Sequence, residues 1–373
     1  MKSILPAFIC LKGFELLPDE AEMLREYNPM GVTLFKRNID NPDQVKKLTS
    51  DIRLAVGRDD FLIATDQEGG VVRRLRPPYW HEYISQQKLG TLSYDEAYEA
   101  IRLHAALIAH DLRALGINMD FTPVADTLHQ DTTGAIASRC FSDDPEVVAE
   151  YAGIMAQTLM ENGVCPCMKH LPGHGLANTD SHTGLPVITA DESVIQRDFL
   201  PFQKMADFIP MGMTAHIVLP HVDDQPITQS AKGIDLIRNQ IGFDGLLITD
   251  ALEMQALQGT LPEKVQKSLQ AGCDVVCYCS GHDQNNPNML QDNIDVLKAC
   301  TPISDKTLAR LAKVNSVISK NAPEIDVASL TERYDVLAQK AQSILEQGKD
   351  HTENWAKNNY SFLSAKGFSR FRN

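Results

Sequence analysis

A polar loop at residues 169–186 gathers side chains that could do chemistry. It reads K-H-L-P-G-H-G-L-A-N-T-D-S-H-T-G-L-P, and its glycines and prolines are typical of a loop rather than of a helix. Lys169 and His170 open it at the carboxyl end of an apolar run that predicts a buried strand. Asp180 and His182 lie two residues apart, so in an extended loop the carboxylate can hold the imidazole in one tautomer. This pair predicts a general acid/base.

Asp250 is a second candidate, because it directly follows the apolar run at residues 245–249. A carboxylate held rigidly at a strand end can act as a nucleophile and form a covalent ester with a substrate. The Ala-Leu-Glu sequence that follows Asp250 suits a helix start equally well, with Asp250 as its N-cap. The residues alone support both interpretations.

The histidines of the polar loop raise a metal alternative. His170 and His174 have an H-x-x-x-H spacing, and His182 could supply a third zinc ligand. Pro172 and Gly173 prevent the helix that would place the first two histidines on one face. We therefore expect no metal ligands and no organic cofactor.

Short apolar runs alternate with helical segments along most of the chain, which is the pattern of βαβ units. Eight such runs occur, at residues 4–11, 31–35, 61–65, 117–122, 163–168, 211–216, 245–249 and 274–279. Helix-opening residues predict helices at 43–56, 95–115, 144–162 and 191–207. Eight strands are the number that a closed parallel barrel requires. The fold class expected is therefore α/β, a (β/α)8 TIM-like barrel with extra C-terminal helices.

The C-terminal part of the chain has a different pattern. Heptad-like apolar spacing predicts two helices, 304–320 and 328–346, packed as a pair, and residues 354–373 predict a loose tail. We expect a catalytic barrel over residues 1–325 and a C-terminal helix and tail over 326–373.

Polar side chains follow five of the eight predicted strands. They are Asp66, Gln67 and Glu68 after the third run, Asp120 and Asp126 after the fourth, Lys169 and His170 after the fifth, His216 after the sixth and Asp250 after the seventh. The active site of such a barrel collects at the carboxyl ends of its strands. These residues are therefore candidates for one site, although His216 could equally be a hydrogen-bonded core histidine.

Composition limits the partners of this protein. A formal net charge of −14 argues against nucleic acid or an anionic membrane, which attract basic proteins. Eight cysteines without a C-x-x-C pair predict a reducing compartment. The apolar N-terminal run lacks a small-x-small cleavage site, which favours a first strand over a signal peptide, and no run is long enough to span a membrane. We expect a cytoplasmic monomer that acts on a small soluble ligand.

Six segments together resemble family 3 glycoside hydrolases, and more closely the bacterial β-N-acetylhexosaminidases of cell-wall recycling. They are G-V-T-L-F-K-R-N (31–38), A-T-D-Q-E-G-G-V-V-R-R-L (64–75), D-F-T-P-V-A-D (120–126), R-C-F-S-D-D-P (139–145), the K-H-L-P-G-H-G…D-S-H loop and I-T-D-A-L-E-M (248–254). They occur in the family's order, and the D-S-H loop is typical of its N-acetylglucosaminidase branch. Cys140 stands where many members have Ser.

The resemblance implies a retaining exo-β-N-acetylglucosaminidase that hydrolyses muropeptide-type substrates through a covalent glycosyl-enzyme. It implies Asp250 as nucleophile, His182 as acid/base and Asp180 as the residue that orients His182. It also implies substrate-binding roles for Asp66, Arg74, Arg139, Lys169 and His170. Three alternatives remain: a phosphorylase, since a neutral histidine would not repel phosphate as acceptor, a metal-dependent amidohydrolase that uses the histidine cluster, and a sugar-binding protein without turnover.

Overall fold

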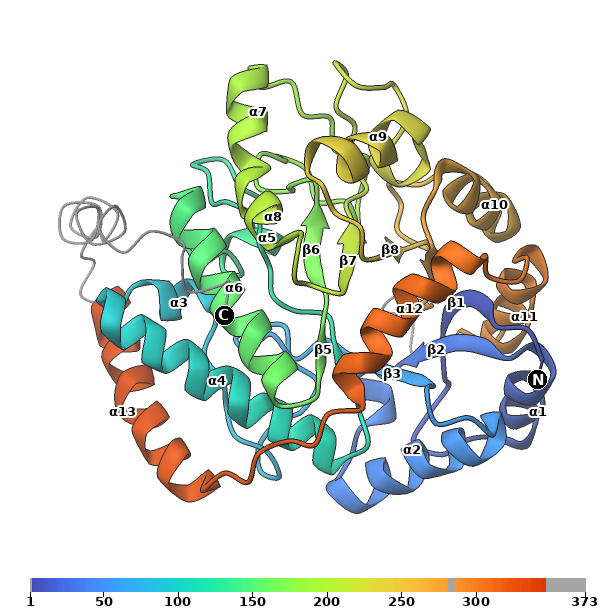
Figure 1. Ribbon diagram of the computed structural model, residues 1–373, viewed down its shortest axis with the longest axis horizontal. Coiled ribbons are helices and arrows are strands. Elements are labelled where there is room, and N and C mark those ends of the chain that lie inside the picture. Colours follow the sequence, from blue (N-terminus) through green and yellow to red (C-terminus); the bar gives the residue numbers. More distant parts are fainter. Residues whose placement is uncertain (1, 281–285, 347–373) are drawn as a thin grey trace.

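A single sheet of parallel strands forms the centre of the molecule in the computed structural model, which describes residues 2–280 and 286–346 (Figure 1). The strand order is β5-β4-β3-β2-β1-β9-β8-β7-β6. The strands are β1 (Leu5–Cys10), β2 (Pro29–Thr33), β3 (Leu62–Thr65), β4 (Met119–Asp120), β5 (Cys165–Pro166), β6 (Met168–Leu171), β7 (Met211–Thr214), β8 (Leu246–Ala251) and β9 (Val275–Cys277). The expected TIM-like fold is confirmed.

The two ends of this strand order, β5 and β6, come from one predicted strand that Cys167 interrupts. The β5 segment pairs with β4, whereas β6 pairs with β7, so a single stretch of chain nearly closes the barrel. The predicted strand 163–168 was too short, because pairing with β7 extends it to Leu171. Lys169 and His170 therefore lie in a strand rather than in the polar loop.

Helices surround the barrel, and three of the four predicted between strands occur with nearly the predicted bounds: α2 (Pro42–Val56), α4 (Tyr94–Ala114) and α6 (Pro145–Glu161). Asn41 caps α2 by accepting a hydrogen bond from the backbone of Gln44 at 3.0 Å. The predicted helix 191–207 is two helices, α7 (Glu192–Asp198) and α8 (Leu200–Met205). Pro201 explains the break, because it has no N–H to bond the carbonyl of Arg197.

The remaining helical elements among the described residues connect or flank the strands. They are α1 (Pro18–Tyr27), η1 (Lys36–Asn38), α3 (Gln86–Gly90), α5 (Gly134–Ala137), η2 (Ile227–Gln229), α9 (Ala231–Asp235), the π-helix η3 (Leu236–Gln240), α10 (Leu261–Ala271) and α11 (Met289–Ala299). None of the helices in the described ranges is long and apolar enough to cross a membrane.

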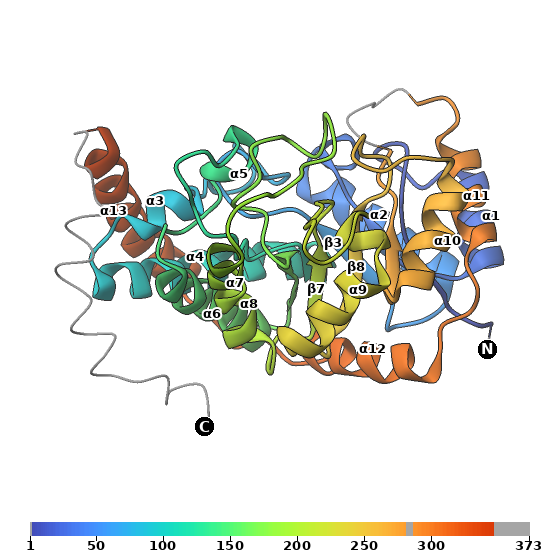
Figure 2. The same cartoon turned by 90° about the horizontal axis from the view of Figure 1, so that it is seen from above.

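The last two described helices lie on different parts of the barrel (Figure 2). Helix α12 (Asp305–Ile318) packs Leu311 and Val314 against the cluster of side chains inside the barrel. Helix α13 (Val327–Glu346) packs instead against α4 and α3. The prediction that these helices form a packed pair is wrong, because each buries its apolar face against the barrel or its helices. The predicted tail at 354–373 lies outside the described residues.

The barrel interior is filled with apolar side chains. Phe8, Leu62 and Ile248 lie in this cluster and are fully buried. Gly31 makes room for them, because a Cβ there would lie 2.6 Å from the carbonyl oxygen of Leu62 and 2.7 Å from the ring of Phe8. Full burial of one such side chain stabilises a fold by about 1.5–3 kcal/mol. This packed interior holds the strand ends, and hence the polar residues on them, in fixed positions.

Candidate active site

The polar residues predicted at strand ends lie at one end of the barrel. Asp66 directly follows β3, Lys169 and His170 lie in β6, and Asp250 lies near the end of β8. All described pairs within the sheet are parallel, so the carboxyl ends of these strands share one rim. Arg139 reaches this rim from the loop that follows α5.

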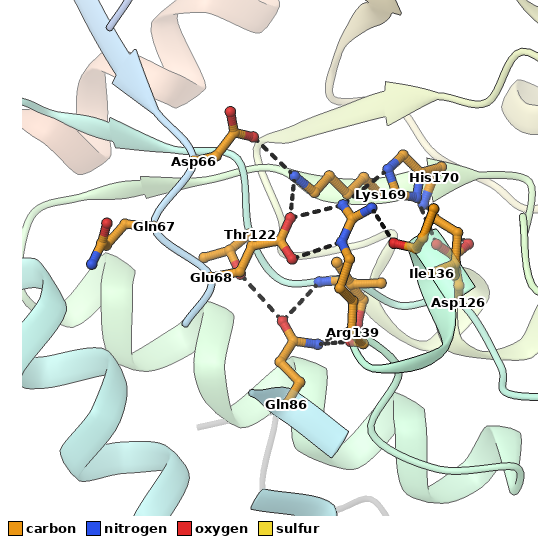
Figure 3. Close-up of polar contacts among 12 residues, drawn as sticks. Asp66, Gln67, Glu68, Gln86, Thr122, Asp126, Ile136, Arg139, Lys169 and His170 are labelled. Atoms are coloured by element: carbon orange, nitrogen blue, oxygen red, sulfur yellow. Dashed lines mark hydrogen bonds and ion pairs between the residues drawn. The ribbon is translucent and has the colours of Figure 1, made fainter. Parts of the chain in front are cut away.

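A network of ion pairs links Asp66 and Glu68 to three cations, and Figure 3 shows two of these, Lys169 and Arg139. Asp66 accepts hydrogen bonds from Arg74 Nη2 at 2.9 Å and from Lys169 Nζ at 3.2 Å. Glu68 accepts two from Arg139, at 2.9 Å from Nε and 2.8 Å from Nη2. Lys169 Nζ also lies 2.6 Å from Oε1 of Glu68. The sequence assigned no role to Glu68, but the structure makes it the centre of this network.

The network keeps its members charged. Burial by itself would raise the pKa of Asp66, but Lys169 and Arg74 outweigh this effect and lower it to about 2. Burial also opposes protonation of Lys169, yet Glu68 and Asp66 raise its pKa above the ordinary value. The site therefore presents a carboxylate that only accepts hydrogen bonds beside cations that only donate them, which suits the hydroxyl and carbonyl groups of a sugar.

Asp126 fixes the position of His170 through hydrogen bonds to its ring and to its backbone. Its Oδ2 lies 2.6 Å from Nδ1 of His170, and its Oδ1 accepts hydrogen bonds from the backbone N–H of His170 at 3.2 Å and of His174 at 2.7 Å. Burial opposes ionisation of Asp126, but His170 outweighs it and the pKa is lowered to about 2. The ionised carboxylate therefore keeps a hydrogen on Nδ1 of His170. Asp126 is a second residue to which the sequence assigned no role.

Asp250 is the last but one residue of β8 and does not begin a helix. The next helix, α10, starts at Leu261, so the N-cap interpretation of Asp250 is wrong. Its half-buried carboxylate accepts a hydrogen bond from the backbone N–H of Ala251 at 2.8 Å. Burial would raise the pKa of Asp250, but His170 and His216 outweigh burial and lower it. Asp250 is therefore ionised at neutral pH, as a nucleophile must be.

His216 lies beneath the end of β8. It is fully buried, and its Nε2 donates to the carbonyl of Ala251 at 3.0 Å while its Nδ1 lies 2.7 Å from Oγ1 of Thr228. Burial lowers its pKa. Both ring nitrogens are satisfied by the protein, which favours the core interpretation of this histidine over the pocket interpretation.

The Asp180–His182 pair lies in the loop after β6. Oδ1 of Asp180 lies 2.8 Å from Nδ1 of His182, and the two side chains are 34% and 51% exposed. Between them Ser181 is buried, and its carbonyl accepts a hydrogen bond from the backbone of Ala256 at 3.2 Å. Ser181 Oγ also lies 3.3 Å from Nε2 of His174. The pair is thus tied to the segment that follows Asp250.

The charge state of Asp180 follows from its partner. Burial would raise the pKa of this carboxyl, but the backbone N–H and the imidazole of His182 outweigh burial and lower it. An ionised Asp180 can only accept a hydrogen bond, so it keeps a hydrogen on Nδ1 of His182 and orients the imidazole.

His170 in β6 and His174 in the loop after it are each hydrogen-bonded to other side chains of the protein. The rings of His170 and His174 meet edge to face with centroids 5.7 Å apart. Nδ1 of His170 is held by Asp126, and Nε2 of His174 by Ser181. Within the described ranges, no three His, Cys, Asp or Glu side chains are grouped so that they could hold a metal ion.

Comparison with known proteins shows the family of this chain. A family model described as the glycosyl hydrolase family 3 N-terminal domain matches residues 11–314. The beta-hexosaminidase of Bordetella avium is 34% identical over 337 residues, which cover 88% of this chain and 93% of that protein. The beta-hexosaminidase of Chromobacterium violaceum is 37% identical over 286 residues, which cover 74% of this chain and 78% of that protein.

Solved structures show the same likeness. The structure of NagZ from Neisseria gonorrhoeae in complex with N-trifluoroacetyl-D-glucosamine has a TM-score of 0.79 and 28% sequence identity, and the match covers 90% of this chain and 98% of that one. The resemblance found in the sequence is confirmed. This chain therefore belongs to glycosyl hydrolase family 3, in which it is a glycoside hydrolase of the beta-hexosaminidase type.

Proposed function

We propose that this protein is a retaining exo-β-N-acetylglucosaminidase with Asp250 as nucleophile and His182 as general acid/base. The supporting observation is that an ionised carboxylate lies near the end of β8, while a backbone hydrogen bond to Ser181 ties the Asp180–His182 pair to the segment that follows this strand. Two groups with these properties at one barrel rim fit a double displacement.

In the first step, a carboxylate oxygen of Asp250 attacks the anomeric carbon and the bond from that carbon to the aglycone oxygen breaks. The imidazolium of His182 gives its Nε2 proton to the leaving oxygen. Asp180 favours the charged imidazole before the transfer and keeps it oriented. The products of this step are the free aglycone, an ester between the sugar and Asp250, and a neutral His182.

In the second step, neutral His182 removes a proton from water as the water oxygen attacks the anomeric carbon. The ester bond breaks, Asp250 leaves as a carboxylate, and His182 is again protonated. Two inversions at the anomeric carbon give net retention.

The buried network would bind the non-reducing N-acetylglucosamine. Asp66 would accept hydrogen bonds from sugar hydroxyls, and Arg74, Arg139, Lys169 and His170 would donate to hydroxyl or carbonyl oxygens. A sugar that lacks one of these groups would leave a polar group of the site without the hydrogen bond that the full substrate supplies. Such a loss discriminates strongly between substrates.

The cellular role is part of the same proposal. The likeness to cell-wall recycling enzymes supports a soluble muropeptide as substrate and a place in peptidoglycan recycling in the cytoplasm. The net charge of −14 supports the absence of a nucleic-acid or membrane partner. We expect a monomer that uses no metal or organic cofactor, which size-exclusion chromatography and metal analysis would test.

One assay tests the proposal. The purified protein is incubated with a chromogenic β-N-acetylglucosaminide, with and without phosphate, and the sugar product is followed by NMR. We expect N-acetylglucosamine to appear first as the β-anomer in both samples. Initial release of the α-anomer would contradict the retaining mechanism, and N-acetylglucosamine 1-phosphate would identify a phosphorylase.

A further inference from the structure

Two buried hydrogen bonds, through His104, connect Tyr334 of helix α13 to the backbone of Glu68, and a third ties Tyr334 to the backbone of Ile84. The N–H of Ile84 donates to Oη of Tyr334 at 2.9 Å, and Oη of Tyr334 lies 3.1 Å from Nδ1 of His104. Nε2 of His104 lies 3.0 Å from the carbonyl oxygen of Glu68. Tyr334 and His104 are both fully buried, so water does not compete for these bonds.

The chemistry of the groups sets the direction of each hydrogen bond. A carbonyl oxygen only accepts, so Nε2 of His104 carries the hydrogen that reaches Glu68. Burial lowers the pKa of His104 to about 4, so its ring is neutral at pH 7 and Nδ1 is an acceptor. Tyr334 must then donate its O–H to Nδ1 while it accepts from Ile84. The hydroxyl of Tyr334 thus accepts one hydrogen bond and donates one, and each ring nitrogen of His104 takes part in one.

The backbone next to Glu68 fits closely against Ile84 and His104. Gly69 has φ of +95°, and a Cβ there would lie 2.3 Å from the carbonyl oxygen of Ile84 and 2.8 Å from Cε1 of His104. The next residue, Gly70, donates its N–H to the carbonyl of Tyr83 at 2.8 Å. The loop therefore has no room to move toward α4 or toward the segment that holds Ile84, and the hydrogen bond from His104 prevents it from moving away.

The side chain of Glu68 points from this anchored backbone to the ion-pair network in Figure 3. It holds Arg139 through two hydrogen bonds and lies 2.6 Å from Nζ of Lys169. A small displacement of the Glu68 backbone would move both cations together. Residues that fix this backbone therefore set where the donors of the sugar site lie.

We propose that Tyr334 and His104 are positioning residues of the sugar site, which act on bound sugar through Glu68. Helix α13 lies beyond residues 11–314, which the family model matches, so a segment outside the family domain completes this site. The inference rests on the proposed function, because it takes Arg139 and Lys169 as donors to the sugar.

The substitution Tyr334→Phe tests the hydrogen-bonded path from Tyr334 through His104 to Glu68, because it removes only the hydroxyl. Tyr83→Phe is a matched control, because Tyr83 lies in the same aromatic cluster with its ring centroid 5.8 Å from that of Tyr334, is 1% exposed and donates its hydroxyl to Asp111 at 2.8 Å. Each variant loses one buried hydroxyl, but only Tyr334→Phe interrupts the path to Glu68. We expect Tyr334→Phe to raise KM for the chromogenic substrate about fivefold to tenfold with kcat within about twofold, because the sugar contacts bind substrate and transition state alike. Tyr83→Phe should keep KM within about twofold of wild type.

Substitutions of His104 give a second, independent measurement. Glutamine can donate to the carbonyl of Glu68 and accept from Tyr334, whereas leucine can do neither. We expect His104→Leu to raise KM at least as much as Tyr334→Phe, and His104→Gln to restore most of the affinity. Equal KM values for the two His104 variants, at temperatures where both are folded by circular dichroism, would overturn the inference.

Arg139→Lys separates failure of this inference from failure of the proposed sugar site. If Arg139→Lys leaves KM unchanged, the donors do not bind sugar and both proposals fail. If Arg139→Lys raises KM while Tyr334→Phe behaves like Tyr83→Phe, only the positioning role is wrong. We expect the effect of Tyr334→Phe on KM to shrink when Arg139→Lys is already present, because the two residues act on one contact. If the two substitutions instead multiply each other's effects on KM, they act independently, which would contradict the positioning role of Tyr334.

Discussion

Oδ1 of Asp180 accepts two hydrogen bonds from a single residue, from the backbone N–H of His182 at 2.9 Å and from its Nδ1 at 2.8 Å. These bonds fix the ring relative to the loop backbone. They also determine which nitrogen does chemistry, because Nδ1 is committed to the carboxylate and Nε2 is the one that can exchange a proton with a substrate.

The first prediction follows from this relationship. If His182 protonates the leaving oxygen, its loss should matter in proportion to the proton demand of that oxygen. We expect His182→Ala to slow glycosylation of a natural-type disaccharide by about a hundredfold or more, but that of a dinitrophenyl glycoside by less than about tenfold. Asp180→Asn should give a weaker form of the same pattern. Single-turnover rates measure both, and equal losses on the two substrates would remove His182 from the general-acid role.

The second prediction concerns the nucleophile. Asp250→Asn keeps the size of the side chain but cannot form the glycosyl ester, so kcat/KM should fall at least about a thousandfold on both substrates. Asp224→Asn is a suitable control, because it removes an exposed carboxylate from the loop after β7. Near-native turnover by folded Asp250→Asn protein would exclude this residue as the nucleophile.

The third prediction concerns Asp120, which is fully buried beneath the ion-pair network. Its Oδ1 accepts a hydrogen bond from the backbone of Gln67 at 2.8 Å, while its Oδ2 has no hydrogen-bond partner among the described residues. Burial, with a smaller effect from Asp66 and Glu68, raises the pKa of Asp120 to about 8. The folded protein therefore holds a proton between about pH 4 and pH 8 that the unfolded chain has lost.

A raised folded pKa gives stability that is present below the unfolded pKa and is lost as the pH rises through the folded pKa. Asp120→Asn stays neutral throughout, so its free energy of unfolding should improve relative to wild type by roughly 3–4 kcal/mol between pH 5 and pH 8, at about 1.4 kcal/mol per pH unit. The test is how the difference in free energy of unfolding between the two proteins changes with pH. A constant cost of burying the amide adds the same amount at every pH and does not affect this slope. Urea unfolding at a series of pH values measures it, and parallel pH profiles for the two proteins would show that Asp120 is ionised in the folded state.

The fourth prediction separates the glycosidase from an amidohydrolase that uses the same barrel. Each proposed catalytic step is carried by Asp250, His182 and Asp180, so dialysis against EDTA should leave kcat/KM unchanged. Loss of activity that zinc restores would favour the amidohydrolase. The control is the same dialysis without chelator.

Local patterns in the sequence determined much of the frame. The apolar runs located the strands, and Pro42 located the start of α2, because strands and helix starts depend on residues close together in the chain. The break at Pro201 has an equally local cause and could have been predicted. Polar residues after the strands indicated the end of the barrel that carries the site, because all strand ends of a parallel barrel share one rim. The division at residue 325 and the cytoplasmic location stay predictions.

Only the tertiary structure decided how the candidate residues act. Asp120 and Asp126 lie in one short motif, yet the pKa of the first is raised to about 8 and that of the second is lowered to about 2. Burial affects both carboxyls, but only Asp126 faces a histidine that stabilises its charge. The role of Glu68 likewise depends on tertiary contacts, with Arg139 and with Lys169 of β6, both far from it in the sequence. The position of a residue along its strand determines the direction in which its side chain points. Its charge state and its partners depend on distances between segments that meet only when the barrel closes.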